Sequence, residues 1–336
     1  MYMNLSSQES SLHKGFPVPS FLKMCGPGLE IGSESITFFE SREEKGMILP
    51  KIFDHVLLEK KCILGAVTDM AECEELVEVL TNLAKKHSIT QASITLPEEE
   101  VYIFSTMIYL EEGQAVETAL ISQIEKNVPF SPDDITYDYQ IVRKKGRGLI
   151  LSVAAASKKT VQIYEEVLIE AGITPLRAMS ENQAIINALL NQSDVEPHIV
   201  VYISEERAVF SICENGVVEL TSSIVFDRKF EGEIDKSNVF VNLIQKKVSQ
   251  ILMHWYGSKG KDQKSKMHHM LMYTFDTEVT HDIMVYLKGF FPHLGFHSGT
   301  PWENMFDIEE YLPDITKDQA FLFVKAIGAS LVGQQI

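Results

Sequence analysis

The order of predicted strands and helices repeats in the two halves of the sequence, and this repetition most constrains the fold. Each half opens on a short turn with a β-rich hairpin and then alternates strands with helices. Such alternation predicts an α/β fold in which helices pack on sheets, and the repeat predicts two similar lobes. The turns at Gly32-Ser33 and Asn215-Gly216 mark the two hairpins, and Asn-Gly between β-rich runs is a strong hairpin signal.

The chain length and the change of sequence pattern near Pro197 suggest where one lobe ends and the other begins. A chain of 336 residues suffices for about two domains of about 150 residues each. We expect a flexible tail over residues 1–20, a first lobe over 21–196 and a second lobe over 197–336. The C-terminal helix, predicted over Lys317–Leu331, is expected to return toward the first lobe.

Several helix and strand boundaries can be predicted from local signals. Pro129 ends a helix over 115–128, because proline cannot continue a helix, and Gly172 ends another over 158–171. Ser180 precedes Gln183 by three positions, a spacing typical of a helix N-cap. Strands are expected at 36–40, 92–96, 101–104, 135–142, 149–156, 198–203, 208–213, 217–221 and 270–273, and further helices at 72–86, 238–255 and 279–288.

The charge and cysteine content narrow the classes of function. A net charge of −17 repels nucleic acid, so no nucleic-acid partner is expected, and the basic segment 143–148 is interpreted as a solvated hairpin tip. Four cysteines without a CxxC pair indicate thiols in a reducing compartment. The adjacent His268 and His269 lack acids at ligand spacing and predict no metal site.

The sequence shows neither a membrane segment nor a catalytic motif. Residues 1–20 lack the basic start and apolar run of a signal peptide, and no stretch approaches about 18 consecutive apolar residues. We therefore expect a soluble, intracellular protein without direct membrane insertion. Neither a nucleophile elbow nor a Gly-x4-Gly-Lys-Ser/Thr loop occurs, and scattered Ser, His and Asp residues define no catalytic triad.

Four segments together resemble the PilM family of type IV pilus assembly proteins, which is itself similar to the division protein FtsA and the actin-like superfamily. The first is Leu29-Glu30-Ile31-Gly32-Ser33-Glu34-Ser35, which resembles an actin-like phosphate loop. The second is the helix end Val128-Pro129-Phe130 with the downstream Tyr137-Asp138-Tyr139. The third is the run Ser152–Asn182. The fourth joins Pro301–Asp307, Tyr311-Leu312-Pro313 and Ala326–Leu331.

This resemblance implies a ribonuclease H-like, actin-like fold of two lobes. It also implies a small inserted α+β subdomain in the first lobe, at about residues 92–170. Actin-like proteins hold ATP and Mg²⁺ between the lobes, using glycine-containing hairpins and acidic residues. Glycine lets the backbone approach an anion, and carboxylates balance the metal. The positions that match the first loop are Glu30, Gly32, Ser33 and Ser35.

The other expected parts of a nucleotide site are not found in this sequence. The family's second Asp-x-Gly aligns with Tyr202-Ile203-Ser204, followed by Glu205 and Glu206, whose charges would repel phosphate. The glycine pair expected after a strand aligns with Thr274–Thr277, and another pair with Val225–Arg228, and both segments lack glycine. We therefore expect no required cofactor, with ATP and Mg²⁺ as the candidates if one binds, and no enzymatic activity beyond weak or absent ATP hydrolysis.

The function implied by the resemblance is a scaffold of the pilus inner-membrane platform. Its expected partner is the cytoplasmic N-terminal peptide of a PilN-like bitopic membrane protein, with pilus motor and platform proteins as further candidates. The protein is then cytoplasmic and peripheral to the inner membrane through that partner. Val128, Pro129 and Phe130 are expected to shape the binding subdomain, or else only to end a helix and pack. The alternative is a nucleotide-dependent ATPase of the FtsA type, which would need an amphipathic C-terminal tail that the last residues, 331–336, do not provide.

Overall fold

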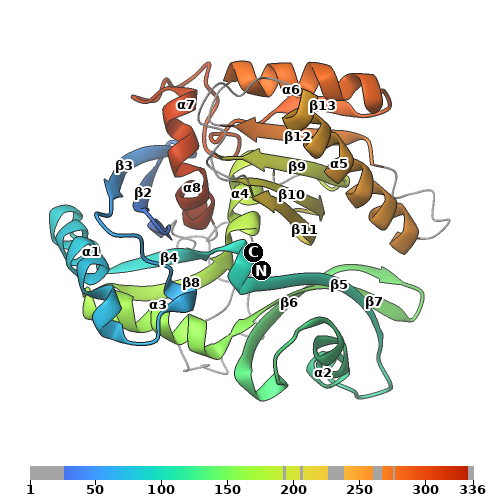
Figure 1. The fold of residues 1–336 in the computed structure, drawn as a ribbon, viewed down its shortest axis with the longest axis horizontal. Coiled ribbons are helices and arrows are strands. Elements are labelled where there is room, and N and C mark those ends of the chain that lie inside the picture. Colours follow the sequence, from blue (N-terminus) through green and yellow to red (C-terminus); the bar gives the residue numbers. More distant parts are fainter. Residues whose placement is uncertain are drawn as a thin grey trace.

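The computed structural model describes residues 26–191, 194–204, 207–225, 238–259, 267–274 and 277–331, so the predicted tail over 1–20 lies outside the described residues. Within them the strands form two five-stranded sheets and one three-stranded sheet. The two larger sheets belong to two lobes that lie side by side, and the smaller sheet forms a separate layer beneath the second lobe (Figure 1).

The first-lobe sheet has the order β3-β2-β1-β4-β8. β1 pairs antiparallel with β2 and parallel with β4, and β4 pairs parallel with β8. Helix α1 connects β3 to β4, and α3 leads into β8, as parallel neighbours require. The bounds are β1 Gly28–Ile31, β2 Ser35–Glu44, β3 Met47–Leu57, α1 Glu74–His87, β4 Gln91–Leu96, α3 Lys158–Glu170 and β8 Thr174–Ser180.

The second-lobe sheet repeats this arrangement with the order β11-β10-β9-β12-β13. β9 is antiparallel to β10 and parallel to β12, as β1 is to β2 and β4. The repetition predicted from the sequence is thus present as one topology used twice. The bounds are β9 His198–Ile203, β10 Arg207–Glu214, β11 Val217–Val225, α5 Asn238–Lys259, β12 His269–Thr274, α6 Thr277–Phe290 and β13 Gly295–Ser298.

Side-chain alternation gives each sheet an outer and an inner face. In β1, Leu29 and Ile31 pack into the core with α1 and α3, so Gly28 and Glu30 point to the opposite face. In β9, Ile199 and Val201 pack under α5 and α6, whereas Tyr202 belongs to a cluster on the other side. The inner faces of the two sheets therefore face each other across the two helices that lie between the lobes.

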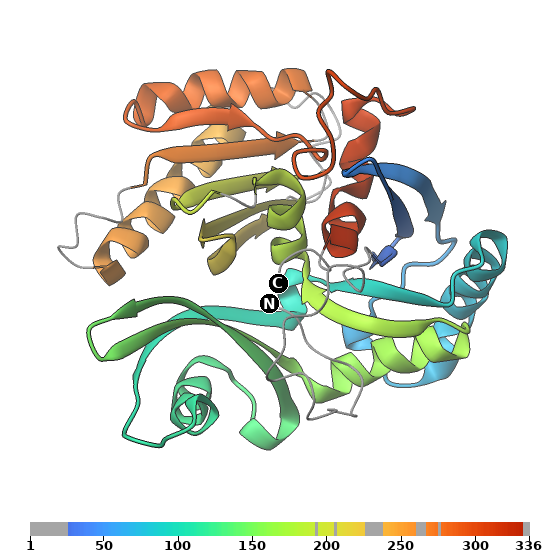
Figure 2. The same ribbon diagram turned by 180° about the vertical axis from the view of Figure 1, so that it is seen from behind.

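These two helices are α4 (Glu181–Leu189), which follows the first-lobe sheet, and α8 (Val324–Ser330) at the end of the second lobe. Figure 2 shows both from behind, between the two sheets. They approach closely because small residues line their contact. A Cβ atom at Gly328 would lie 1.7 Å from the carbonyl oxygen of Ala184 in α4. Helix α8 approaches β1 equally closely, since a Cβ atom at Gly28 would lie 1.9 Å from the carbonyl oxygen of Ala326. Neither position can hold a larger residue without moving backbone.

The C-terminal segment differs from the single helix predicted over Lys317–Leu331. It consists of α7 (Lys317–Ala320), a 3₁₀ turn at Phe321–Phe323, and α8. The 3₁₀ turn buries both Phe321 and Phe323, because its tighter winding changes which side chains face the lobe. Periodicity alone predicts an apolar face here but does not reveal the change of winding.

The small sheet has the order β5-β7-β6 and carries α2 on one face. It lies between β4 and α3 in the chain, so it is an insertion into the first lobe. The sequence placed this insert at about 92–170, but β4 and α3 pack into the first-lobe core, which favours narrower bounds. We propose 97–157 as the insert. Its elements are β5 Val101–Tyr109, α2 Val116–Asn127, β6 Ile135–Lys145 and β7 Gly148–Ser157.

The insert also packs against β11, the edge strand of the second lobe. Ser105 Oγ donates a hydrogen bond of 3.0 Å to Glu219, and Arg143 forms an ion pair of 3.0 Å with Glu214. Asn215 donates to the backbone oxygen of Val142. The segment 143–148, predicted to be a solvated tip, is therefore partly strand, and Arg143 is used in this contact.

Candidate functional site

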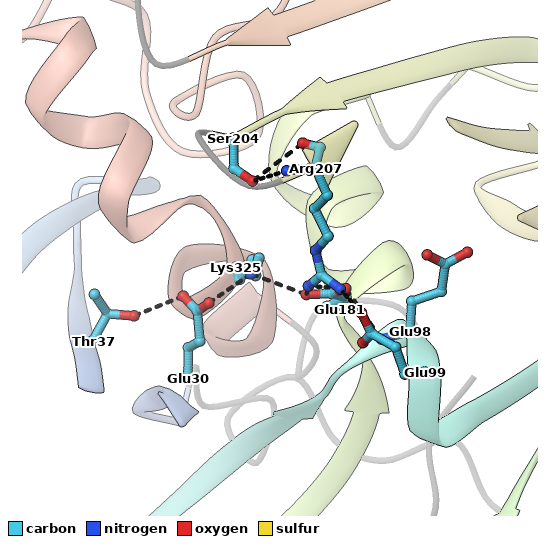
Figure 3. A network of polar contacts seen from close by, with 8 residues as sticks. All are labelled: Glu30, Thr37, Glu98, Glu99, Glu181, Ser204, Arg207 and Lys325. Carbon is cyan, nitrogen blue, oxygen red and sulfur yellow. Dashed lines mark hydrogen bonds and ion pairs between the residues drawn. The ribbon is translucent and has the colours of Figure 1, made fainter. Parts of the chain in front are cut away.

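A network of charged side chains joins the two lobes between their inner faces (Figure 3). At its centre, Lys325 Nζ lies 2.6 Å from Glu30 Oε1 and 2.9 Å from Glu181 Oε2. The Lys325 side chain is 12% exposed, and those of Glu30 and Glu181 are 17% and 3% exposed. Charged carboxylates and an ammonium group this deeply buried are stable only when they are paired with each other.

Each member of this trio is positioned by a different element. Glu30 lies on β1, where Thr37 of β2 donates a hydrogen bond of 2.7 Å to its second oxygen. Glu181 is the first residue of α4, directly after Ser180, whose side chain caps the helix by accepting from the Gln183 N–H. Lys325 is the second residue of α8. The network therefore depends on the close crossing of α4 and α8.

Arg207, at the start of β10, extends the network from the second lobe. It contacts both oxygens of Glu181, at 2.6 and 2.7 Å, and also pairs with Glu99. The Glu98 backbone N–H donates to Glu181 as well, at 3.1 Å. Figure 3 shows Arg207 reaching down from its strand to these carboxylates. Glu181 is thus bound by two cations, Arg207 from the second-lobe sheet and Lys325 from α8, the helix that packs on β1.

An aromatic side chain of the second-lobe sheet, Tyr202, lies beside the network. Tyr202 is buried, stacks on Phe321 with ring centroids 5.0 Å apart, and lies 5.7 Å from Lys325 Nζ. An ammonium group over an aromatic face is attracted by its quadrupole. Because Tyr202 and Glu30 are the next-to-last residues of β9 and β1, the two lobes present equivalent positions to the same lysine.

The electrostatics of the network favour the charged forms of Lys325 and Glu181. Burial alone would lower the pKa of Lys325, but the carboxylates of Glu181 and Glu30 outweigh it and hold that pKa above its ordinary value. Burial would likewise raise the pKa of Glu181, and the charges of Lys325 and Arg207 outweigh it and hold that pKa below the ordinary value. The ion pair between Lys325 and Glu181 therefore persists across the whole neutral pH range.

Glu100 differs, because it lies near the network without a cation of its own. Burial raises its pKa to about 7, although the Gly65 N–H and the Tyr164 hydroxyl hydrogen-bond to it and favour the charged form. The neighbouring charges of Glu99 and Glu181 add to the increase. Burial also raises the pKa of Glu98. Glu100 therefore changes its protonation near neutral pH.

The predicted phosphate loop is a tight turn between β1 and β2. The Gly32 N–H donates to the Ser35 carbonyl at 2.9 Å, and the Ser33 carbonyl accepts from the Cys62 N–H at 2.8 Å. The Glu34 carbonyl accepts from the Leu58 N–H. The segment after β3 is therefore bonded to this turn, and of the predicted loop residues the structure brings only Glu30 into the charged network.

The second-lobe positions aligned with the family's nucleotide motifs are only partly described. Tyr202 stands where an acidic residue was expected, and Ser204 forms the β9–β10 turn by bonding with Arg207. The Thr274 hydroxyl lies 2.7 Å from that of Thr280, both buried. Val225 is exposed at the end of β11. The sequence prediction also named three segments that lie outside the described part of the chain, namely 205–206, 226–228 and 275–276.

The predicted partner-binding residues lie where α2 of the insert ends. Val128 is buried in the insert core, and its N–H donates to the Ile124 carbonyl at 2.9 Å. Pro129 is exposed. The Phe130 side chain is 42% exposed and packs edge-on against Tyr102, with ring centroids 5.8 Å apart. Val128 thus has a packing role, whereas Phe130 presents an aromatic surface to solvent.

Sequence reasoning did not single out Lys325, Glu181 or Arg207. One signal was available, because Lys325 is the only charged residue in the apolar segment 319–331. A lone lysine in such a run lies either on an exposed face or in a buried ion pair, since an unpaired buried charge is too costly. Its partner Glu30 is 295 positions away in the sequence, so only the fold could reveal the pair.

Two lobes of the same topology, with two helices crossing between them and a polar site at the crossing, define the actin-like fold class. A solved structure described as the "PilM-PilN type IV pilus biogenesis complex" matches with a TM-score of 0.67 and 15% identity, covering 93% of this chain and 99% of that chain. The family model for "Type IV pilus assembly protein PilM" matches residues 28–248. The chain belongs to the type IV pilus assembly protein PilM family.

Other similarities are weaker. The cytoplasmic domain of EpsL from the type II secretion system of Vibrio cholerae matches with a TM-score of 0.46 and 9% identity, over 74% of this chain and 81% of that one. The ethanolamine utilization protein EutJ from Carboxydothermus hydrogenoformans matches with a TM-score of 0.47 and 14% identity, over 94% and 90%. Comparison with curated protein sequences gives no match. Among the described residues, no helix is both long and apolar enough to cross a bilayer.

Proposed function

We propose that this protein is a scaffold of the type IV pilus inner-membrane platform that binds the cytoplasmic N-terminal peptide of a PilN-like membrane protein. The observation that carries the proposal is membership of the PilM family, together with similarity over almost the whole chain to a PilM–PilN complex. The protein would then lie in the cytoplasm and reach the inner membrane through this partner.

We place the peptide beside the exposed end of α2, between the insert and the first lobe. Phe130 supports this placement because its half-exposed ring is held in orientation by Tyr102. An extended peptide gains affinity when apolar side chains enter such a surface and its backbone finds hydrogen-bond partners. Val128 supports the surface from within the insert core, and Pro129 follows the end of α2 and fixes the direction of the chain.

The test is a calorimetric titration with a synthetic peptide, namely the cytoplasmic N-terminal residues of the PilN-like protein encoded in the same genome. We expect saturable binding that Phe130→Ala weakens roughly tenfold or more, as for an aromatic anchor. Ile121→Ala is the matched control, since Ile121 is equally exposed at 42% but lies on the side of α2. Equal affinities of the two variants would reject the assignment of Phe130.

We further propose that the inter-lobe site does not hold Mg²⁺ and ATP. The carboxylate of Glu30 already bonds with Lys325 and Thr37, and Tyr202 supplies a ring where a second acid would be needed. A metal ion would have to displace a buried ammonium group, so the residues present do not fit the metal–nucleotide group. This supports a scaffold without ATPase activity over a nucleotide-dependent ATPase of the FtsA type.

A titration with MgATP separates these two functions. The scaffold predicts no saturable heat and no change in melting temperature. One-site saturation at micromolar concentrations of MgATP would instead favour the ATPase. That result would not decide the peptide proposal, which the peptide titration tests separately.

A further inference from the structure

We propose that His269 and His297 form a binding site for a divalent transition-metal ion such as Zn²⁺ on the second-lobe sheet. His269 is the first residue of β12, and His297 lies on β13, the parallel strand beside it (Figure 1). Nδ1 of His269 and Nε2 of His297 lie 3.3 Å apart. The proposal goes beyond the scaffold function and depends neither on the peptide surface nor on the network around Lys325.

The strand register brings both imidazoles to the inner face of the sheet. His297 pairs with Leu271, an inner-face residue two positions after His269, and alternate residues of a strand share a face. His268 belongs to the opposite face, so the adjacent histidines in the sequence cannot bind one ion together. The partner of His269 is 28 positions away instead, on the next strand.

A glycine keeps the space beside the two nitrogens open. Gly295 is the register partner of His269 on β13. A Cβ atom at Gly295 would lie 3.3 Å from Nε2 of His297 and 3.5 Å from Nδ1 of His269. Any larger residue would therefore crowd both nitrogens at once, whereas glycine leaves room for an ion and its water ligands.

The separation of the nitrogens matches that of two ligands on one tetrahedral ion. Zinc binds imidazole nitrogen at about 2.0–2.1 Å, and two such ligands at the tetrahedral angle lie about 3.3–3.4 Å apart. Without metal the same nitrogens share a hydrogen bond, since one ring can donate its N–H to the other. The described residues contain no group of three or more side chains placed to hold a metal. Water therefore completes the coordination, and we expect micromolar affinity.

The surroundings of the two rings favour metal binding. Nε2 of His269 lies 3.2 Å from Glu196 Oε2. A metal-binding histidine commonly donates its second N–H to a carboxylate in this way, which leaves the other nitrogen free for the ion. Burial and the neighbouring His269 and His198 lower the pKa of His297, which favours the neutral ring that a metal requires.

The site is accessible and is connected to the segment between the lobes. His297 is exposed and the side chain of His269 is 35% exposed, so an ion can reach both rings. Glu196 belongs to the segment that joins α4 to β9 and thereby links the two lobes. A bound ion makes the N–H of His269 a stronger donor to Glu196, so it holds this segment more firmly on the second-lobe sheet.

The experiment is a calorimetric titration of the full chain, without a histidine tag, with ZnCl2. We expect one-site saturation at micromolar concentrations and a melting temperature that rises with the zinc concentration. His297→Ala should abolish both effects. His293→Ala, at another exposed histidine, is the matched control and should bind zinc as the native protein does.

Glu196→Gln distinguishes a metal site from an ordinary hydrogen bond between two histidines. It removes no ligand, yet zinc affinity should fall roughly tenfold or more because the carboxylate behind His269 is lost. Absence of saturable heat with the native protein would overturn the proposal. Equal zinc affinity of the native protein and His297→Ala would overturn it as well, since the ion would then bind elsewhere. If His297→Ala fails to fold, His297→Gln replaces it with the same expectations. The peptide titration is unaffected by either result.

Discussion

At the scale of single residues, the most informative side chains are those that the sequence marks as functional without revealing their interaction partners. Glu30 was predicted as part of a residual nucleotide site, and in the structure its carboxylate pairs with Lys325. Residue type and position on a strand could be predicted because they depend on local pattern. The partner could not, because it depends on how two distant helices cross. Ser180 shows the opposite case, since its predicted capping of Gln183 is entirely local and is confirmed.

Glu100 gives a prediction on pH dependence. Its pKa is raised from 4.5 in the unfolded chain to about 7 in the fold, so the folded state holds more protons between these values. Stability is therefore greatest below the unfolded pKa and is lost as the pH rises through about 7. Glu100→Gln should remove this loss and raise the free energy of unfolding at pH 8 by about 1–3 kcal/mol.

The measurement is urea unfolding of both proteins at several pH values from 5 to 8, in steps of about one unit. Glu125→Gln, at an exposed glutamate of α2, controls for the loss of one negative charge. If Glu100→Gln and the native protein kept the same slope of stability against pH, the raised pKa of Glu100 would be refuted.

At the scale of elements, the bounds of a helix could be predicted where a residue in the local sequence marks its end. The bounds of α2 and α3 agree with the predicted helices within one residue, because Pro129 and Gly172 end them. β3 and β13 were missed, since neither shows strict alternation, and both gain their stability from pairing with a neighbouring strand. The 3₁₀ turn before α8 was also missed, because burial of Phe321 and Phe323 in the assembled lobes determines it.

The crossing of α4 and α8 gives a second prediction. Gly328→Ala should destabilise the protein by about 3 kcal/mol or more, because the new methyl group would overlap the Ala184 backbone, which cannot rotate away. Gly257→Ala in α5 is the control, since nothing lies within 4 Å of its Cβ position. That variant should be neutral or about 1 kcal/mol more stable, as expected for alanine in a helix.

Thermal and urea unfolding of both glycine variants check this prediction. Similar stabilities would mean that the two helices are further apart than described. A large loss confined to Gly328→Ala would support a backbone contact that only glycine permits.

At the scale of the whole molecule, the repeated order of predicted strands and helices predicted two lobes of one topology. The strand orders of the two five-stranded sheets confirm this prediction. The sequence did not reveal that the insert is bonded to the second lobe through Arg143 and Glu214. The basic segment was interpreted as a solvated tip, since a run of charged residues usually is. Its first member, Arg143, is instead paired with Glu214 at the end of β10, a neighbour that only the folded chain provides.

This contact can be weakened selectively. Arg143→Ala should make the amides of β5–β7 exchange roughly tenfold faster, because it leaves Glu214, which is 10% exposed, without this ion-pair partner. Lys144→Ala is the matched control, as Lys144 is the next residue and is exposed. Hydrogen exchange read by mass spectrometry compares the two, and identical exchange in both variants would show that the ion pair does not hold the insert.

The close packing of α8 on β1 also has a consequence for how the protein is made. Among the described residues, β1 is the first strand and rests against α8, the last helix, since Gly28 lies directly at Ala326. During synthesis the ribosome produces β1 some 300 residues before its neighbour, at about 5–20 residues per second. The inner face of the first lobe must therefore remain uncovered until α8 has been made. A chain that ends before α8 would expose that face to chaperones and proteases, so only chains that include α8 can close the site between the lobes.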